Sequence, residues 1–180
     1  MRITDSRYDR DRLRLTVACR LIRHEARTHT IRQCTGLSGD RIRKLYRAYM
    51  QEAIEQPLRR RRGKSPRQMS YFRRSPAHEL QAATLGMLLN LCGLLGRRRV
   101  LRQPTIEEVA RFCDVYETFE SLCPVPVITL EHAWYLLQVL AYEDEFVLAR
   151  CPDCQATWLR DTLDVLPDNC AACRVGAPPD

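Results

Sequence analysis

The sequence predicts a mainly α-helical protein with a helix-turn-helix-like unit and a small zinc-binding module near the end of the chain. Apolar residues recur at spacings of three and four along most of the sequence, which is the period of amphipathic helices. Two Cys-x-x-Cys pairs, at 151–154 and 170–173, are separated by fifteen residues, and this spacing is typical of four-cysteine zinc sites. Partly alternating residues around Trp158 fit short strands between the two pairs.

A long amphipathic helix is expected over residues 10–27, because apolar side chains recur there at helical spacing. The residues of this face are Leu13, Val17, Ala18, Leu21 and Ile22. The other face of the helix is basic.

Residues 30–50 have the pattern of a helix-turn-helix. Gly36 can take the left-handed conformation that ends the first helix, and Leu37 can fill the corner. Ser38 or Asp40 can cap the second helix. Its apolar stripe contains Ile42, Leu45, Tyr46 and Tyr49. The cations that lie mainly outside this stripe are Arg41, Arg43, Lys44 and Arg47. Such a layout suits a recognition helix in the major groove of DNA, although helical hairpins without a DNA role share it.

A basic connector is expected over residues 57–76, where prolines prevent a continuous helix. Its candidate nucleic-acid-binding residues are Arg59, Arg60, Arg61, Arg62, Arg73 and Arg74. The segment could become ordered on a phosphate backbone, with Tyr71 or Phe72 against a sugar or base. The alternative is a disordered linker with incidental charge.

Three further helices follow from apolar periodicity and capping signals. One is expected over residues 77–100, ended by Gly96. The next begins with a capping box at Thr105 and Glu108, and Thr129 can cap the third. The expected segments are residues 1–56 with the helix-turn-helix, the connector 57–76, a helical core and partner-interface region 77–148, and the zinc module 149–180.

The four clustered cysteines are predicted to hold one structural zinc ion. The ligands would be Cys151, Cys154, Cys170 and Cys173. Two redox motifs or two disulfides are the alternatives, but a thioredoxin-like motif needs a βαβ context that this part of the sequence lacks. The remaining five of the nine cysteines stand singly among helix-like apolar positions. An odd cysteine count without a signal peptide favours a reducing compartment, so we expect a cytoplasmic protein.

Charge is distributed unevenly along the chain. Residues 1–102 contain 25 Lys and Arg against 8 Asp and Glu, a net +17, whereas residues 103–180 contain 4 against 14, a net −10. A basic half of this kind favours a polyanionic partner, with nucleic acid as the leading candidate. The simpler interpretation is a solvated surface with many arginines.

Neither an enzyme nor a membrane protein is expected. No HExxH, GxGxxG, Walker or GxSxG motif is present. Four thiolates would saturate a zinc ion and leave no position for an activated water. The longest apolar run, residues 85–95, is about half of the roughly 20 residues that cross a bilayer.

Three features in a fixed order resemble one known family. They are RIRKLYR at 41–47, TLEHAW at 129–134, and the four clustered cysteines. With these features the chain resembles, as a divergent member, the FlhC family, the zinc-containing subunit of the bacterial flagellar master transcriptional activator. The likeness extends roughly over residues 10–174. It implies a helical protein that assembles with an FlhD partner, binds flagellar promoter DNA, acts on RNA polymerase and uses the four cysteines as zinc ligands.

Two other functions remain open at the level of sequence. The chain could be a zinc-stabilised protein-interaction module, with the basic half bound to an acidic protein and no DNA contact of its own. It could also be an RNA-binding zinc-ribbon protein.

Overall fold

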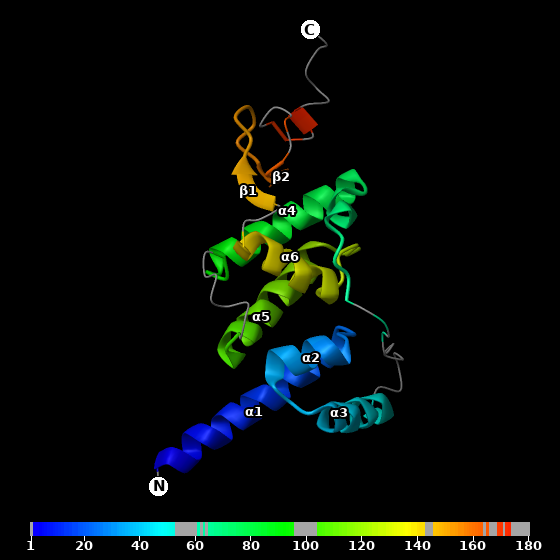
Figure 1. The fold of residues 1–180 in the computed structure, drawn as a ribbon, viewed down its shortest axis with the longest axis vertical. Helices are drawn as coiled ribbons and strands as arrows, with labels where there is room; N and C mark the ends of the chain where they lie inside the picture. The colour runs from blue at the N-terminus through cyan, green and yellow to red at the C-terminus, as the bar shows by residue number, and fades with distance from the viewer. Residues whose placement is uncertain are drawn as a thin grey trace. The chain divides into compact units, whose positions relative to one another are not determined.

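The computed structural model describes residues 2–52, 61, 63, 65–95, 104–142, 146–163, 165, 169–170 and 172–173 (Figure 1). Over this part of the chain the protein is mainly helical, with a two-stranded antiparallel sheet and a cluster of four cysteines after it. The predicted fold class is confirmed. No helix among the described residues is both long and apolar enough to cross a membrane.

The elements follow one another in a simple order along the chain (Figure 1). They are α1 (Arg2–Arg23), α2 (Thr28–Thr35), α3 (Gly39–Glu52), the 3-10 helix η1 (Met69–Arg73), α4 (Pro76–Leu91), α5 (Ile106–Leu122), α6 (Leu130–Tyr142), β1 (Phe146–Arg150) and β2 (Thr157–Asp161).

Contacts divide the chain into two compact units. Residues 1–66 and 99–114 belong to the first unit, and residues 67–98 and 115–180 belong to the second. The first unit therefore contains α1, α2, α3 and the beginning of α5. The second contains η1, α4, the end of α5, α6 and the sheet, so the cysteine cluster belongs to a unit with helices of its own.

The first helix is longer at its start and shorter at its end than the sequence predicts. It ends at Arg23 rather than at residue 27, because Glu25 takes a left-handed conformation (φ 57°). The backbone N–H of Glu25 then donates to Ile22 O (2.9 Å), and that of Ala26 donates to Leu21 O (2.9 Å). These two bonds form a Schellman motif that satisfies the last carbonyls of α1.

The expected turn between α2 and α3 is present. Gly36 has φ 69° and its N–H donates to Arg32 O, which ends α2. Leu37 is buried beneath the turn, and Ser38 Oγ accepts from the N–H of Arg41 at the start of α3 (3.3 Å). Since α1, α2 and α3 contact one another pairwise, they form a three-helix unit with a three-residue turn between its last two members.

The helix expected over residues 77–100 ends earlier. α4 stops at Leu91 because Gly93 adopts φ 68° and the N–H of Leu94 donates to Leu89 O (2.9 Å). This is a second Schellman motif, with Leu94 turned into the core at 1% exposure. The expected stop at Gly96 was wrong: the earlier Gly93 supplies the left-handed residue.

The two following helices start where the sequence predicts. The N–H of Thr105 donates to Glu108 Oε2 (2.9 Å), and the N–H of Glu108 donates to Thr105 Oγ1 (3.2 Å), so the capping box at the start of α5 is complete. α6 begins directly after Thr129.

Part of the expected connector belongs to the core of the second unit. Phe72 is fully buried in η1, and the Tyr71 hydroxyl donates to Val127 O. The Tyr71 ring stacks on His132 with centroids 3.6 Å apart. The expectation of a contact with a sugar or base is wrong for Phe72, whose side chain is fully buried, and stays a prediction for the half-buried Tyr71.

The sheet packs closely on α4. Its register pairs Leu148 with Leu159 and Arg150 with Thr157. A Cβ atom on Gly86 in the middle of α4 would lie 2.9 Å from Leu148 Cδ2. This close approach fixes the hairpin, and hence the cysteines that follow β1, against the helix.

Candidate metal centre and candidate nucleic-acid interface

The first cysteine pair lies in the loop of the β1–β2 hairpin. Cys151 follows the last residue of β1, and its N–H donates to Ala156 O (3.0 Å). The chain turns back when Gln155 takes a left-handed conformation (φ 60°) and donates from its N–H to Cys151 O (3.0 Å). The hairpin therefore presents both thiols of the pair on one tight turn.

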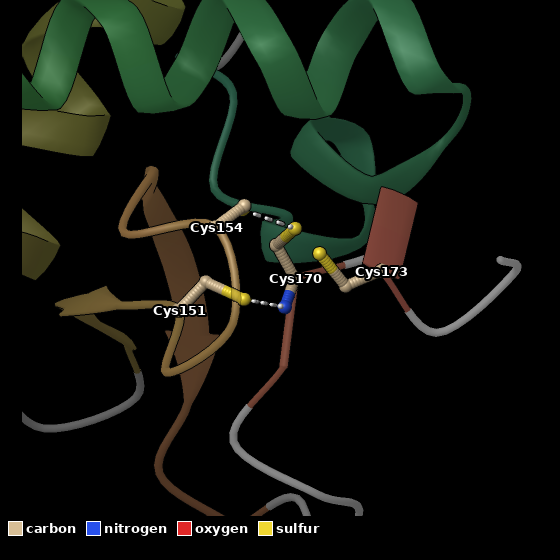
Figure 2. Close-up of side chains that lie close together, drawn as sticks. All are labelled: Cys151, Cys154, Cys170 and Cys173. Atoms are coloured by element: carbon tan, nitrogen blue, oxygen red, sulfur yellow. Dashed lines mark hydrogen bonds between the residues drawn. The ribbon is translucent and has the colours of Figure 1, made fainter. Parts of the chain in front are cut away.

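The second pair comes from a separate segment and faces the first. The N–H of Cys170 donates to Cys151 Sγ (3.4 Å), and Asn169 Nδ2 donates to Asp153. Cys173 lies on a short helical turn, and all four side chains converge (Figure 2). Two chain segments are thus joined through hydrogen bonds as well as through their thiols.

The four sulfur atoms lie close enough together for a shared metal ion. They all lie within 4.8 Å of one another, and Cys154 Sγ is 3.6 Å from Cys170 Sγ. A Zn–S bond of about 2.3 Å gives a tetrahedron with edges of about 3.8 Å. A disulfide needs about 2.05 Å, and the four clustered cysteines are free thiols. The four residues lie together and could hold a metal ion.

The surroundings of the cluster shift the pKa values of two of its thiols in opposite directions. Backbone N–H donors of Cys154 and Cys170 lower the pKa of Cys151 to about 6. The neighbouring sulfurs of Cys154 and Cys170 raise the pKa of Cys173 to about 12. The thiolate of Cys151 is therefore favoured, whereas hydrogen bonds to the sulfurs of Cys154 and Cys170 favour the protonated form of Cys173. A divalent cation at the centre would favour the ionised form of each thiol.

The basic face of α3 is arranged as the sequence predicts. Ile42 and Tyr46 are buried, and the Tyr46 hydroxyl donates to Ala26 O, which ties α3 to the end of α1. The four cations are all exposed: Arg41, Arg43, Lys44 and Arg47. At 100° per residue Lys44 lies opposite the middle of the face formed by Ile42 and Tyr46, and Arg41, Arg43 and Arg47 lie about 80–120° from it on either side. The helix is held by one face and presents long donors on the other.

An acidic residue lies within this basic face and was missed as part of the site. The sequence suggests Ser38 or Asp40 as the cap of this helix. Ser38 Oγ accepts the hydrogen bond from the N–H of Arg41 at the start of α3. The Asp40 carboxylate instead accepts from Arg43 Nη2. The i, i+3 spacing of Asp40 and Arg43 on a helix was the available signal.

The predicted arginines of the connector differ in whether the structure describes them and in what they contact. Arg59, Arg60 and Arg62 lie outside the described residues. Arg61 is exposed and pairs with Glu25 (Nε to Oε2, 2.9 Å). Both members of this pair belong to the first unit, which also contains α3.

The last two predicted arginines belong to the second unit. Arg73 Nη1 lies 3.5 Å from Asp161 Oδ2 on β2. The Arg74 guanidinium lies over the Tyr71 ring, 5.1 Å from its centroid. Both are exposed but have partners inside the unit, so the structure does not bring Arg73 and Arg74 together with the basic residues of α3 into one unit.

Two histidines that are far apart in the sequence share a partner. His78 and His132 both contact the ring of Tyr71, edge-on at 4.9 Å and stacked at 3.6 Å. The Nδ1 atom of each lies 2.8 Å from the hydroxyl at its own helix start, Ser75 or Thr129. The repeated Ser/Thr-x-x-His pattern at two helix starts was the signal for this structural cluster.

No family model matches the sequence, and no curated protein matches it. The functional argument therefore depends on the geometry of the cysteine cluster and of the basic face of α3.

Proposed function

We propose that the protein is a DNA-binding subunit of a transcriptional activator, an FlhC-like protein that assembles with an FlhD-like partner and activates flagellar operons through RNA polymerase. The resemblance in the sequence supports the family and the partners. The observation that supports DNA binding is the exposed basic face of α3, the second helix of the helix-turn-helix-like pair α2–α3.

In this proposal α3 is the recognition helix. Its buried residues hold it to α1 and α2, and its exposed arginines donate to phosphates and to guanine edges, for which the planar guanidinium fork is suited. The net charge of +17 on residues 1–102 supplies the sequence-independent part of the affinity by displacing counterions from the duplex.

The proposed metal is a single structural zinc ion. Four thiolates with hydrogen-bonded sulfurs form a closed tetrahedral donor set, which suits zinc and leaves no position for a substrate. Bound zinc would offset two of the four thiolate charges and join the hairpin loop to the segment around Cys170. Metal analysis of the purified protein should find one zinc per chain.

The test of DNA binding is the salt dependence of the complex. The protein, co-purified with its FlhD-like partner, is titrated with a fluorescent flagellar promoter fragment at rising salt. We expect the logarithm of affinity to fall steeply with the logarithm of salt concentration, because several phosphate contacts are made. Arg43→Ala and Arg47→Ala should weaken binding and flatten this slope while leaving the assembly intact.

Arg150→Ala is the matched control, since Arg150 is an exposed arginine of the second unit. Loss of partner assembly in the α3 variants, with DNA binding absent throughout, would favour the protein-interaction module instead. Stronger competition by duplex RNA than by duplex DNA would favour the RNA-binding alternative. A salt-insensitive complex contradicts the proposal.

A further inference from the structure

A groove follows the edge of β2, between this strand and α4. Its volume of about 560 Å³ lies within the range of ligand sites, about 300–1,000 Å³. It is lined by four consecutive residues, 156–159, and by Pro76, Leu80 and Ala83 of α4, all of which belong to the second unit. Successive side chains of a strand point to opposite faces of a sheet. A lining of four consecutive residues therefore follows the edge of β2 rather than one of its faces.

The hydrogen-bonding pattern of the hairpin directs main-chain groups of β2 to this edge. Cys151 donates its N–H to Ala156 O (3.0 Å), so these two residues are a hydrogen-bonded pair. Hydrogen-bonded and non-hydrogen-bonded pairs alternate along an antiparallel ladder. The next pair, Arg150 with Thr157, is therefore of the second kind. The N–H and C=O groups of Thr157, and of Leu159 two positions further, point away from β1.

These outward groups are unpaired in the part of the chain that the structure describes. There the sheet has two strands, and no hydrogen bond joins the outward N–H and C=O groups of Thr157 or Leu159 to another element. Natural proteins usually cover such an edge or place charges on it. This edge instead lies beside apolar side chains, among them Leu80 and Trp158. An unpaired edge next to an apolar groove is suited to the addition of an extended peptide as a further strand.

The charge of the groove restricts the peptide further. Glu79 lines the groove and is half-buried, and its carboxylate has no ion pair or hydrogen bond with another described residue. The other charged side chain of the lining, Arg73, lies 3.5 Å from Asp161 Oδ2, so its charge is already offset. The uncompensated charge is negative, which favours an occupant with a basic side chain.

We propose that this groove binds an extended segment of a partner protein, which pairs with the outer edge of β2 as a third strand. Apolar side chains of the segment contact Leu80, Ala83 and Trp158, and a lysine or arginine of the segment pairs with Glu79.

The outward main-chain groups of β2 determine which partner fits. A helix uses its own N–H and C=O groups internally and has none to offer to a strand edge. A nucleic acid would bring phosphates to Glu79, which repels them. A second copy cannot offer its β2, because that edge faces its own α4 across the same groove. The proposal does not depend on DNA binding or on an FlhD-like partner.

The probe is the peptide Lys-Val-Thr-Val-Thr-Val, with fluorescein at its N-terminus and an amide at its C-terminus. It is titrated with the full-length, metal-loaded chain in reducing buffer, and anisotropy reports binding. We expect saturable binding with a micromolar Kd, because main-chain hydrogen bonds supply affinity for many sequences. N-methylation of the three central residues removes N–H donors from both edges of the peptide and keeps its side chains and charge. It should raise Kd by about tenfold or more.

Two proline variants test the edge of the sheet that is used. Thr157→Pro removes one outward N–H of β2, and proline is tolerated where the N–H does not belong to the ladder. It should raise Kd by about tenfold. Arg150→Pro is the matched control, because it removes the outward N–H of the paired residue at the opposite edge, and it should leave Kd unchanged. Circular dichroism and metal content show whether both variants keep the fold.

Glu79→Gln tests the charge. It should raise Kd for the lysine peptide by about threefold and leave binding of a norleucine analogue of that peptide unchanged. Absence of saturable binding, an equal Kd for the N-methylated peptide, or equal effects of Thr157→Pro and Arg150→Pro overturns the proposal. The comparison of the two peptides uses the unaltered protein, so it decides the outcome if a proline variant fails to fold.

Discussion

At the scale of single residues, Glu25 is in a conformation that costs free energy. Its φ of 57° belongs to the left-handed region, which a non-glycine residue occupies at about 1 kcal/mol or more. The position is the C′ residue of a Schellman motif, where glycine is preferred. The side chain also accepts from Arg61, an exposed ion pair that contributes little.

We predict that Glu25→Gly raises the free energy of unfolding by about 1 kcal/mol relative to Glu25→Gln. Both changes remove the ion pair with Arg61, and only glycine relieves the backbone. Urea unfolding of the two variants measures the difference. Equal stabilities would show that the left-handed conformation at Glu25 carries no cost.

Asp40 is the residue whose charge opposes the proposed function of α3. Its carboxylate is exposed and pairs with Arg43 on the proposed DNA-binding face. We predict that Asp40→Asn strengthens promoter binding severalfold, because it removes a repulsion of phosphate and releases the Arg43 guanidinium. The measurement is fluorescence anisotropy at about 0.1 M salt, where charges within about 10 Å still interact.

Glu107→Gln provides the control for Asp40→Asn. Glu107 is exposed, belongs to the same unit and also lies in the first turn of a helix, so both changes remove one charge from a similar place. A similar gain in affinity from both variants would assign the effect to net charge and would contradict a specific place for Asp40 in the interface.

At the scale of elements, the packing of α4 on the hairpin depends on the absence of a side chain at Gly86. A Cβ atom there would meet the ends of Leu148 (2.9 Å) and Leu140 (3.1 Å). Alanine gains about 1 kcal/mol of helix propensity over glycine, which offsets small movements of these two leucine side chains. A larger side chain has no such compensation.

We therefore predict that Gly86→Ala changes the free energy of unfolding by less than about 1 kcal/mol, whereas Gly86→Val lowers it by about 2–3 kcal/mol through overpacking. Chemical denaturation measures both. Because β1 leads directly into Cys151, Gly86→Val should also weaken metal retention against a chelator. A stable Gly86→Val variant would show that helix and hairpin are not closely packed.

The start of α5 and the end of α4 show how far local sequence signals predict helix boundaries. The capping box at Thr105 and Glu108 was predicted and is present, because it requires residues only three positions apart. The end of α4 was predicted at Gly96 and lies at Leu91. Gly93 and Gly96 offer equivalent local signals, and burial of Leu94 selects the first of them.

At the scale of the whole molecule, the metal should stabilise the second unit selectively. Bound metal would join the loop after β1 to the segment of Cys170, and both belong to this unit. We predict that chelation, or Cys173→Ser, increases amide hydrogen exchange in β1 and β2 and leaves α1, α2 and α3 protected as before. Equal loss of protection in both units would contradict a purely local structural role.

Metal affinity should also fall as pH falls. Raising the pKa of Cys173 to about 12 keeps this thiol protonated at pH 8, so the metal must displace its proton. Cys151, with its pKa lowered to about 6, is already ionised there and begins to bind a proton near pH 6. We predict weaker binding at pH 6 than at pH 8, measured by chelator competition, with proton release detected by calorimetry in two buffers. Affinity independent of pH would exclude thiolate ligation.

Several features of this protein follow from its sequence alone. Helical periodicity, the glycine turn at Gly36, the capping box and the spacing of the four cysteines are local patterns, and local patterns depend on residues that are close along the chain. The cations of α3 could be assigned to the exposed face for the same reason, since Ile42 and Tyr46 fix the buried one.

Only the tertiary structure decided which distant residues meet. It placed Phe72 in the core of the second unit, brought His78 and His132 to the same tyrosine, and paired Arg73 with a residue of β2. It also left one face of α4 exposed, although its composition resembles a core helix. These contacts depend on which elements pack together, and those elements are far apart in sequence. Apolar periodicity shows which face of a helix is suited to burial, but not which element covers that face.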